Sequence, residues 1–161
     1  MTTTQLSTVI AFDPGLNGAW ALLAFNGDFL EAGDLPRWEN MLNGIEIAKL
    51  LWQLNPKQAV IERVHSMPKQ GVASAFTFGA AYGMLIGLSC SNSLPIAYVT
   101  PQKWKSHFRL AGRNKEHSVQ RAIQIYPGAA DFLTLKKHHG RADAILLARY
   151  WVDLVTRGEF V

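Results

Sequence analysis

Runs of apolar and β-branched residues along the chain predict a mixed β-sheet. Three runs follow one another near the start, and Asn26-Gly27 between the second and third is a typical two-residue hairpin turn. Five strands are predicted in all, at Leu6–Asp13, Gly18–Asn26, Asp28–Leu35, Gln58–Val64 and Pro95–Thr100. Three antiparallel strands followed by helix–strand alternation favour an α/β fold, with helices on both faces of a mixed five-stranded sheet. We expect a single domain over residues 1–161.

Two segments show helical patterns. Gly44–Leu54 has helical spacing, with Ile45, Ala48, Leu51 and Trp52 on one side, and Asn55-Pro56 ends it. Val72–Cys90 carries no charged residue over its whole length, which by length alone would also admit a membrane span. Its serines, threonine and glycines make it only moderately apolar, so we interpret it as a buried helix of a protein without membrane contact.

Glycines recur at every fourth position of this second helix, at Gly79, Gly83 and Gly87. They leave one ridge of the helix bare, so that it can approach another backbone closely. The ridge could pack within the monomer or against a second copy of the chain.

Three carboxylates lie at the ends of, or within, strongly apolar stretches. Asp13 follows Val9-Ile10-Ala11-Phe12, Glu62 follows Ala59-Val60-Ile61, and Asp143 precedes Ala-Ile-Leu-Leu-Ala. An acidic group beside a core is costly to desolvate unless a partner compensates it, which suggests one shared cation site. Each residue also has a simpler interpretation: Asp13 as a turn cap, Glu62 in a surface pair with Arg63 or Lys57, and Asp143 at a helix N-terminus.

Charge is divided unevenly along the chain. The net charge of +4 combines residues 1–62, where acids exceed Lys and Arg by seven to three, with residues 63–161, where Lys and Arg exceed acids by thirteen to five. This division favours an acidic site beside a surface that attracts polyanions, although ordinary solubilising charge would look similar. Cys90 is the single cysteine and the N-terminus lacks a secretory pattern, so we expect a cytoplasmic protein.

An ordered set of short motifs resembles the RuvC-type Holliday junction resolvases, a branch of the RNase H-like nucleases. The matching segments are Ile10-Ala-Phe-Asp-Pro-Gly-Leu-Asn-Gly18, Ala59-Val-Ile-Glu-Arg-Val64, Gly79-Ala-Ala-Tyr-Gly83, Thr100-Pro-Gln-Lys-Trp-Lys105, Gly112-Arg-Asn-Lys-Glu116 and Arg141-Ala-Asp-Ala-Ile-Leu-Leu-Ala148. The short form of the chain, with Lys136-Lys137 before the terminal motif, looks most like phage-encoded and viral or mitochondrial members. A phage-type member would act in a bacterial or phage-infected cell.

The resemblance implies a divalent-metal-dependent endonuclease that binds two Mg²⁺ or Mn²⁺ ions and nicks two opposed strands of a four-way junction. Asp13 would bridge the ions, Glu62 would hold one, and the region of Asp143 would hold the other. Two such ions stabilise the attacking and the leaving oxygen, and hard cations prefer carboxylate ligands.

By resemblance, a fourth ligand would come from His138 or His139. Family members carry either Asp or His shortly before the final Asp, at variable spacing. His139 and Asp143 are four residues apart and share a helix face, so we favour His139 as a catalytic metal ligand or proton acceptor, while one or both histidines could contact DNA phosphate instead. A histidine ligand predicts a preference for Mn²⁺ and loss of cleavage as the imidazole protonates.

Basic residues concentrate between Lys103 and Arg121, and they predict a DNA-binding surface that weakens steeply with salt. The cluster comprises Lys103, Lys105, His107, Arg109, Arg113, Lys115, His117 and Arg121. By resemblance, Lys105 and Lys115 line the substrate cleft. His65 occupies the position where cellular family members usually carry an aromatic residue that opens the junction, and it can stack on a base less extensively.

The pattern as a whole predicts a homodimer that pairs through the Phe76–Gly87 helix and resolves branched DNA symmetrically. Two alternatives differ in class. One is a catalytically weak branched-DNA-binding protein of the same fold. The other is an actin-like ATP-binding protein, suggested by Asp13-Pro-Gly with Gly18, but such proteins need a second lobe with a second phosphate loop, and this chain has neither.

Overall fold

The computed structural model describes residues 7–64 and 71–159. A five-stranded sheet forms its centre, in the order β3-β2-β1-β6-β7. Its strands are β1 (Thr8–Asp13), β2 (Ala19–Ala24), β3 (Phe29–Asp34), β6 (Gln58–Glu62) and β7 (Ile96–Val99). The first three are antiparallel to one another, and β6 and β7 run parallel to β1. The five predicted strands and their mixed topology are confirmed, and the part of the Leu6–Asp13 prediction before residue 7 lies outside the described residues.

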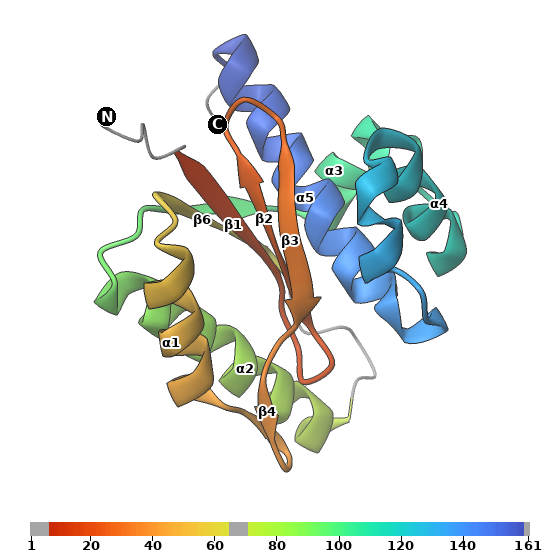
Figure 1. Cartoon of the computed structure of the whole chain (residues 1–161). Coiled ribbons are helices and arrows are strands. Elements are labelled where there is room, and N and C mark those ends of the chain that lie inside the picture. The colour runs from red at the N-terminus through yellow and green to blue at the C-terminus, as the bar shows by residue number, and fades with distance from the viewer. Residues whose placement is uncertain (1–6, 65–70, 160–161) are drawn as a thin grey trace.

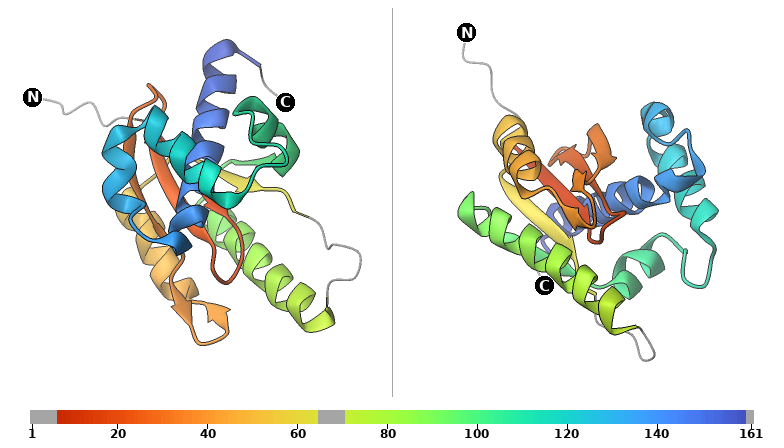
Figure 2. Two further views of the ribbon diagram at one scale, coloured as in Figure 1. Left: turned by 90° about the vertical axis from the view of Figure 1, so that its right-hand side faces the viewer. Right: turned by 90° about the horizontal axis from the view of Figure 1, so that it is seen from below.

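Helices cover both faces of the sheet, as predicted (Figure 1). On one face lie α1 (Gly44–Leu54) and α2 (Val72–Ser91), and on the other lies the long helix α5 (His139–Arg157) with α3 (Pro101–His107) and α4 (Lys115–Ile125) beside it (Figures 1 and 2). A two-stranded hairpin, β4 (Arg37–Trp38) and β5 (Met41–Leu42), follows β3. Two 3₁₀ segments, η1 (Pro127–Phe132) and η2 (Lys136–His138), lead into α5.

Strand β1 lies in the middle of the core, and both of its faces are buried. Val9 and Ala11 pack with α5 on one side, whereas Ile10 and Phe12 pack with α1 and α2 on the other. A strand buried on both faces reads as a continuous apolar run, which is why the sequence around β1 lacks alternation. The charged residue at its end is therefore held in a fixed position.

The helix at Gly44–Leu54 has the predicted bounds, but the predicted face is right for Leu51 and wrong for Ile45 and Trp52. Ile47 and Leu51 point into the core, while Ile45 is 67% exposed and Trp52 is 80% exposed. Asn43 caps the helix by accepting a hydrogen bond from the backbone N–H of Glu46. The two apolar stripes of this helix lie close together on its surface, and packing against α2 selects the one that contains Ile47.

The prediction of a buried helix at Val72–Cys90 is right about the helix and wrong about its burial. Only Ala81, Leu85 and Ser89 of α2 are buried. By length and composition α2 could cross a membrane, but its inner side packs through Leu85 into the core beneath the sheet. We therefore describe it as a surface helix of the fold.

The glycine ridge of α2 is open within the described chain. At Gly79, Gly83 and Gly87 an added Cβ would meet no atom within 4 Å. The ridge lies on the exposed side of the helix together with Phe76, which is 78% exposed. The alternative in which the ridge packs within the monomer is therefore wrong for the residues described.

Candidate active site

Asp13 and Glu62 end two neighbouring parallel strands. In the pairing of β1 with β6, Phe12 lies opposite Ile61, so that the next residue on each strand is a carboxylate. Because parallel strands end at the same edge of a sheet, the two side chains are brought together there. Glu62 is only 9% exposed.

Helix α5 brings the third carboxylate to this edge. Gly140, in its first turn, lies so close to β1 that an added Cβ would be 3.2 Å from Oδ2 of Asp13 and 3.5 Å from Cβ of Ala19. Asp143 follows Gly140 by three residues and therefore lies on the same side of the helix. The missing side chain at Gly140 allows α5 to approach the site.

The pKa values of all three carboxyl groups are raised at this buried site. The pKa of Asp13 is raised well above its ordinary value, first by burial and then by repulsion from Glu62 and Asp143. Burial also raises the pKa of Glu62 and of Asp143. The positive charges of Lys105 and Lys115 act on Asp13 in the opposite direction.

Two neighbours partly compensate the buried carboxylates. Nε1–H of Trp104 donates a hydrogen bond of 2.8 Å to Oε1 of Glu62. A hydrogen bond from Ser118 lowers the pKa of Asp143 against the effect of burial, but Oδ1 of Asp143 is buried without a hydrogen-bond partner in the described structure. Glu62 thus pairs with a core tryptophan rather than with Arg63 or Lys57 at the surface.

This donor set suits a hard divalent cation. Three crowded carboxylates, one with an orphaned oxygen atom, are stabilised when positive charge enters between them. Among residues 7–64 and 71–159, however, no group of three His, Cys, Asp or Glu side chains is close enough to form a complete ligand set. The chemistry and the crowding of the residues present fit such an ion.

The two histidines before Asp143 have different surroundings. His138 is 5% exposed, and its Nδ1 accepts a hydrogen bond of 3.2 Å from the backbone N–H of Leu135. His139 begins α5, and its pKa is lowered by burial and by Lys115, while Asp143 raises it. The lowered pKa favours a neutral His139 imidazole near pH 7, and this ring is close enough to Asp143 for their charges to interact, whereas His138 is turned towards the backbone.

The predicted DNA-binding residues separate into groups. Lys105 on α3 and Lys115 at the start of α4 are close enough to lower the pKa of Asp143. Lys103 and Arg113 are exposed on α3 and on the loop before α4. His65 lies outside the described residues.

One residue of the predicted basic cluster has a different role. Nε2 of His107 lies 3.0 Å from Oδ2 of Asp153, on α5, and its ring packs edge-on against Phe108 and Tyr150. His107 thus holds α3 against α5 and is engaged away from the solvent.

Two contributors to the site were not predicted from the sequence. Trp104 stands between Lys103 and Lys105, and a large apolar residue between two lysines is the available signal that one side chain of this short helix points inward. Gly140 carried no signal in the sequence, because its role depends on the distance between α5 and β1.

The order and direction of the strands, with α5 across one face, define the RNase H-like fold. The comparison with solved structures supports this class: RuvC from Thermus thermophilus in complex with a Holliday junction substrate superposes with a TM-score of 0.69 at 17% identity, over 95% of this chain and 97% of that one. A second Thermus thermophilus RuvC structure gives a TM-score of 0.68 at 17% identity, over 94% and 97%. The predicted fold is thereby confirmed.

Two further proteins are similar. The fowlpox virus resolvase, solved with substrate Holliday junction DNA, gives a TM-score of 0.60 at 12% identity over 92% of this chain and 98% of that one. In sequence, the chain is 32% identical over 85 residues to the chloroplastic Holliday junction resolvase MOC1 of Chlamydomonas reinhardtii. That match covers 52% of this chain but only 10% of the relative. No protein-family model matches the chain.

Proposed function

We propose that this protein is a divalent-metal-dependent endonuclease that resolves four-way DNA junctions by paired, symmetric nicks. The observation that carries the proposal is the meeting of Asp13, Glu62 and Asp143, from three separate elements, at the end of β1. Burial raises the pKa of all three, and repulsion from neighbouring carboxylates raises those of Asp13 and Glu62 further. The similarity to MOC1 and the shared fold of RuvC and the fowlpox resolvase support the choice of substrate.

Each side chain of the site has a role in this proposal. Asp13, Glu62 and Asp143 would hold two Mg²⁺ or Mn²⁺ ions, with His139 as the fourth ligand or as the acceptor of the proton from the attacking water. When bound, such ions neutralise the developing charge on the phosphoryl group and activate the water. Trp104 fixes the orientation of the Glu62 carboxylate through its hydrogen bond.

The cations beside the carboxylates bind the substrate. Lys105 and Lys115 neutralise the phosphates nearest the reacting one, and Lys103 and Arg113 extend this contact along the strand. His65 remains a predicted contact to a base at the junction. Lys105 and Lys115 thus bind the DNA, whereas the carboxylates and His139 would bind the ions.

The identity of the ion depends on His139. An imidazole ligand favours Mn²⁺ over Mg²⁺. Since the pKa of His139 is lowered by its surroundings, protonation of the ring should reduce cleavage only below its ordinary pKa of about 6.5. Equal rates with Mg²⁺ and Mn²⁺, together with no change on His139→Gln, would show that this side chain is not a ligand.

We also propose that two copies pair through α2. The apolar stripe on its outer side, with Phe76 and the bare ridge at Gly79, Gly83 and Gly87, has no cover in the described chain. A two-fold dimer would present two equal sites to opposed strands of one junction.

The test is a cleavage assay on a four-way junction whose four strands are labelled separately. Wild-type protein should nick two opposed strands with Mg²⁺ or Mn²⁺, leave the junction uncut with chelator, and leave linear duplex uncut. Asp13→Asn should abolish the nicks. Asp28→Asn, at an exposed carboxylate in the turn between β2 and β3, is the matched control and should keep them. Full cleavage in the presence of chelator would overturn the proposal.

A second candidate is a branched-DNA-binding protein with little or no catalysis. It is favoured by the lack, in the described part of the chain, of three metal-binding side chains close enough to form a ready-made set. Retention of the junction without any cut, with either ion, would select it. The single domain, the phage-type origin and the cytoplasmic location remain predictions.

A further inference from the structure

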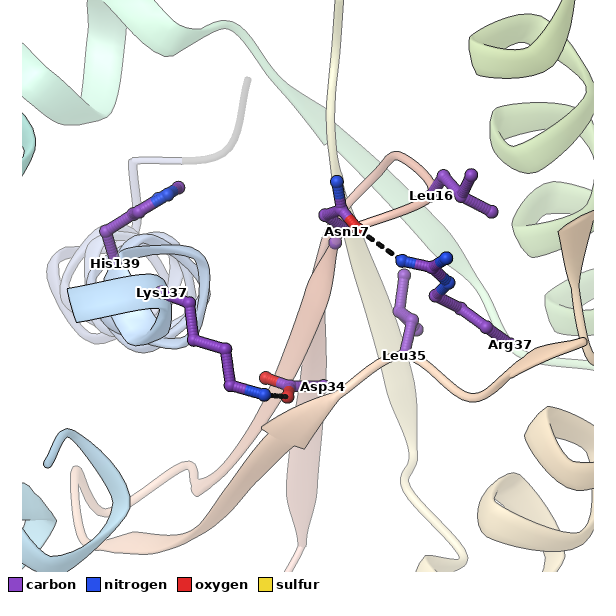
Figure 3. A pocket seen from close by; sticks show the side chains of 8 residues that line it. Leu16, Asn17, Asp34, Leu35, Arg37, Lys137 and His139 are labelled. Atoms are coloured by element: carbon purple, nitrogen blue, oxygen red, sulfur yellow. Dashed lines mark hydrogen bonds and ion pairs between the residues drawn. The ribbon is translucent and has the colours of Figure 1, made fainter. Parts of the chain in front are cut away.

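A separate pocket lies on the other flank of His139 from Lys115. It has a volume of about 480 Å³ and is bordered by the turn after Asp13, the end of β3, the start of β4 and the segment before α5. The residues around it are Leu16, Asn17, Gly18, Asp34, Leu35, Arg37, Lys137 and His139 (Figure 3). We call it the Arg37–Lys137 pocket.

Positive charge exceeds negative charge in this pocket. Oδ1 of Asp34 is already bound by Nε of Arg141 at 2.7 Å, and Oδ2 of Asp34 is 3.7 Å from Nζ of Lys137. Arg37 forms no ion pair among the residues that the structure describes. The charge of Asp34 is thus already paired by Arg141 from outside the pocket lining, and the charges of Arg37 and Lys137 remain for an anionic ligand.

Arg37 is held in place by neutral partners. Its Nη1 donates to Oδ1 of Asn17, and its Nη2 lies 3.4 Å from the backbone carbonyl of Glu39 (Figure 3). A guanidinium group has five N–H donors, so about three remain available here. A planar fork that is already oriented loses little freedom on binding a phosphate, which favours arginine over a free lysine at such a point.

The pocket adjoins the proposed active site. His139 lines the Arg37–Lys137 pocket and also a second one, which Lys115 and Lys136 border on the opposite flank. The residue that follows His139 contacts both places: an added Cβ at Gly140 would be 3.2 Å from Asp13 Oδ2 and 3.6 Å from the carbonyl oxygen of Asn17, which lines the pocket. A strand that places a phosphate at Asp13 therefore has basic groups on both flanks.

We infer that the Arg37–Lys137 pocket binds a backbone phosphate of the DNA strand on the flank of the cleaved phosphate opposite Lys115. The inference rests on the proposed function and adds a contact from Arg37, which belongs to the acidic segment 1–62. Arg37 and Lys137 bind the phosphate oxygens, while Asp34 and Asn17 position them.

The test compares two variants of equal charge by anisotropy of a labelled junction, in chelator so that no strand is cut. Arg37→Gln with Lys137→Gln removes the pocket cations. The matched control is Lys57→Gln with Arg157→Gln. It removes one exposed lysine just before β6 and one exposed arginine at the end of α5, both at the ends of these elements away from Glu62 and Asp143. Binding is measured between roughly 50 and 200 mM salt, the range over which phosphate contacts change the affinity strongly.

The pocket variant should bind the junction roughly 3- to 10-fold more weakly at fixed salt, as expected for loss of one exposed but oriented phosphate contact. Its slope of log K against log salt should fall by about 0.7–0.9, the value for one phosphate. The control should keep the wild-type slope. Arg37→Lys, which keeps the charge, should keep the slope while binding less tightly.

Equal losses in the pocket variant and the control would overturn the inference, because they would reflect net charge alone. An unchanged slope in the pocket variant would also overturn it, and if the wild type still binds and cuts junctions, the proposed function stands. Failure of the wild type itself to bind the junction would refute both, and it is recognised before any variant is compared.

Discussion

Alanine in place of Gly79 and Gly83 should stabilise the single chain while weakening the dimer. Both positions are exposed on the outer side of α2, and an added Cβ at either would meet nothing within 4 Å. In the interior of a helix alanine is favoured over glycine by about 0.8–1.0 kcal/mol, so the double variant should gain roughly 1.5–2 kcal/mol. For a chain of this size that corresponds to a rise of about 3–8 °C in Tm.

The effect on pairing has the opposite sign. Where two backbones meet across a glycine ridge, an added methyl group overpacks the contact by about 1–3 kcal/mol. Since about 1.4 kcal/mol is a tenfold change in an equilibrium constant, the dimer dissociation constant should rise by roughly tenfold or more. Sedimentation velocity over a range of concentrations measures this constant, and thermal unfolding at low concentration measures the gain in the monomer.

The Tm and the dimer dissociation constant together distinguish the possible roles of the glycine ridge. A higher Tm with an unchanged dimer constant would show that copies do not meet there. A lower Tm would refute the reasoning itself, since it would mean that the ridge is packed within one chain. Gly128→Ala, at a glycine with equally open surroundings outside α2, should leave the dimer constant unchanged.

Three further predictions concern the site. Asp13→Asn should raise the free energy of unfolding in chelator. Burial and repulsion raise the pKa of this carboxyl, so its ionisation destabilises the fold as pH rises above the ordinary value of 3.8. Urea unfolding should show a gain over wild type that grows from about pH 4 to 8, and a gain that shrinks over this range contradicts the prediction. Gly18→Ala should destabilise by about 1–3 kcal/mol or more, since its Cβ would lie 2.3 Å from the carbonyl oxygen of Asp13, and an unchanged calorimetric Tm would argue against this contact. Trp104→Phe removes the hydrogen-bond donor that lowers the pKa of Glu62, so the pH below which cleavage is lost should move upwards. An unaltered pH profile of cleavage would show that this hydrogen bond is not important for the site.

The sequence predicted those parts of the fold that depend on local pattern. The run Val9-Ile10-Ala11-Phe12 and the Asn26-Gly27 turn each carry their own signal, since burial on two faces and a turn with positive φ restrict the residue types that fit. Asp13 and Glu62 could be named as partners because a charge at the end of a buried strand needs compensation. Helix α1 shows the limit of such patterns, since the choice between Ile45 and Ile47 as the inward residue depends on the neighbouring helix.

The remaining features of the site depend on distances between remote segments. His138 and His139 differ only because η2 turns the first towards the backbone of Leu135, and no spacing rule predicts that turn. Likewise, Arg37 and Lys137 are one hundred positions apart, and each reads in isolation as ordinary surface charge. Their common pocket arises because β4 and the start of α5 both border the turn after Asp13.

The site combines β1 with α5, which are the first strand and the last helix that the structure describes. During synthesis, Asp13 and Glu62 emerge long before Asp143, and without α5 one face of the sheet lacks its main cover. A ribosome-bound chain therefore has neither the third carboxylate nor a finished core until α5 has left the exit tunnel. The three carboxylates can therefore meet only after α5 has been synthesised and has packed against the sheet.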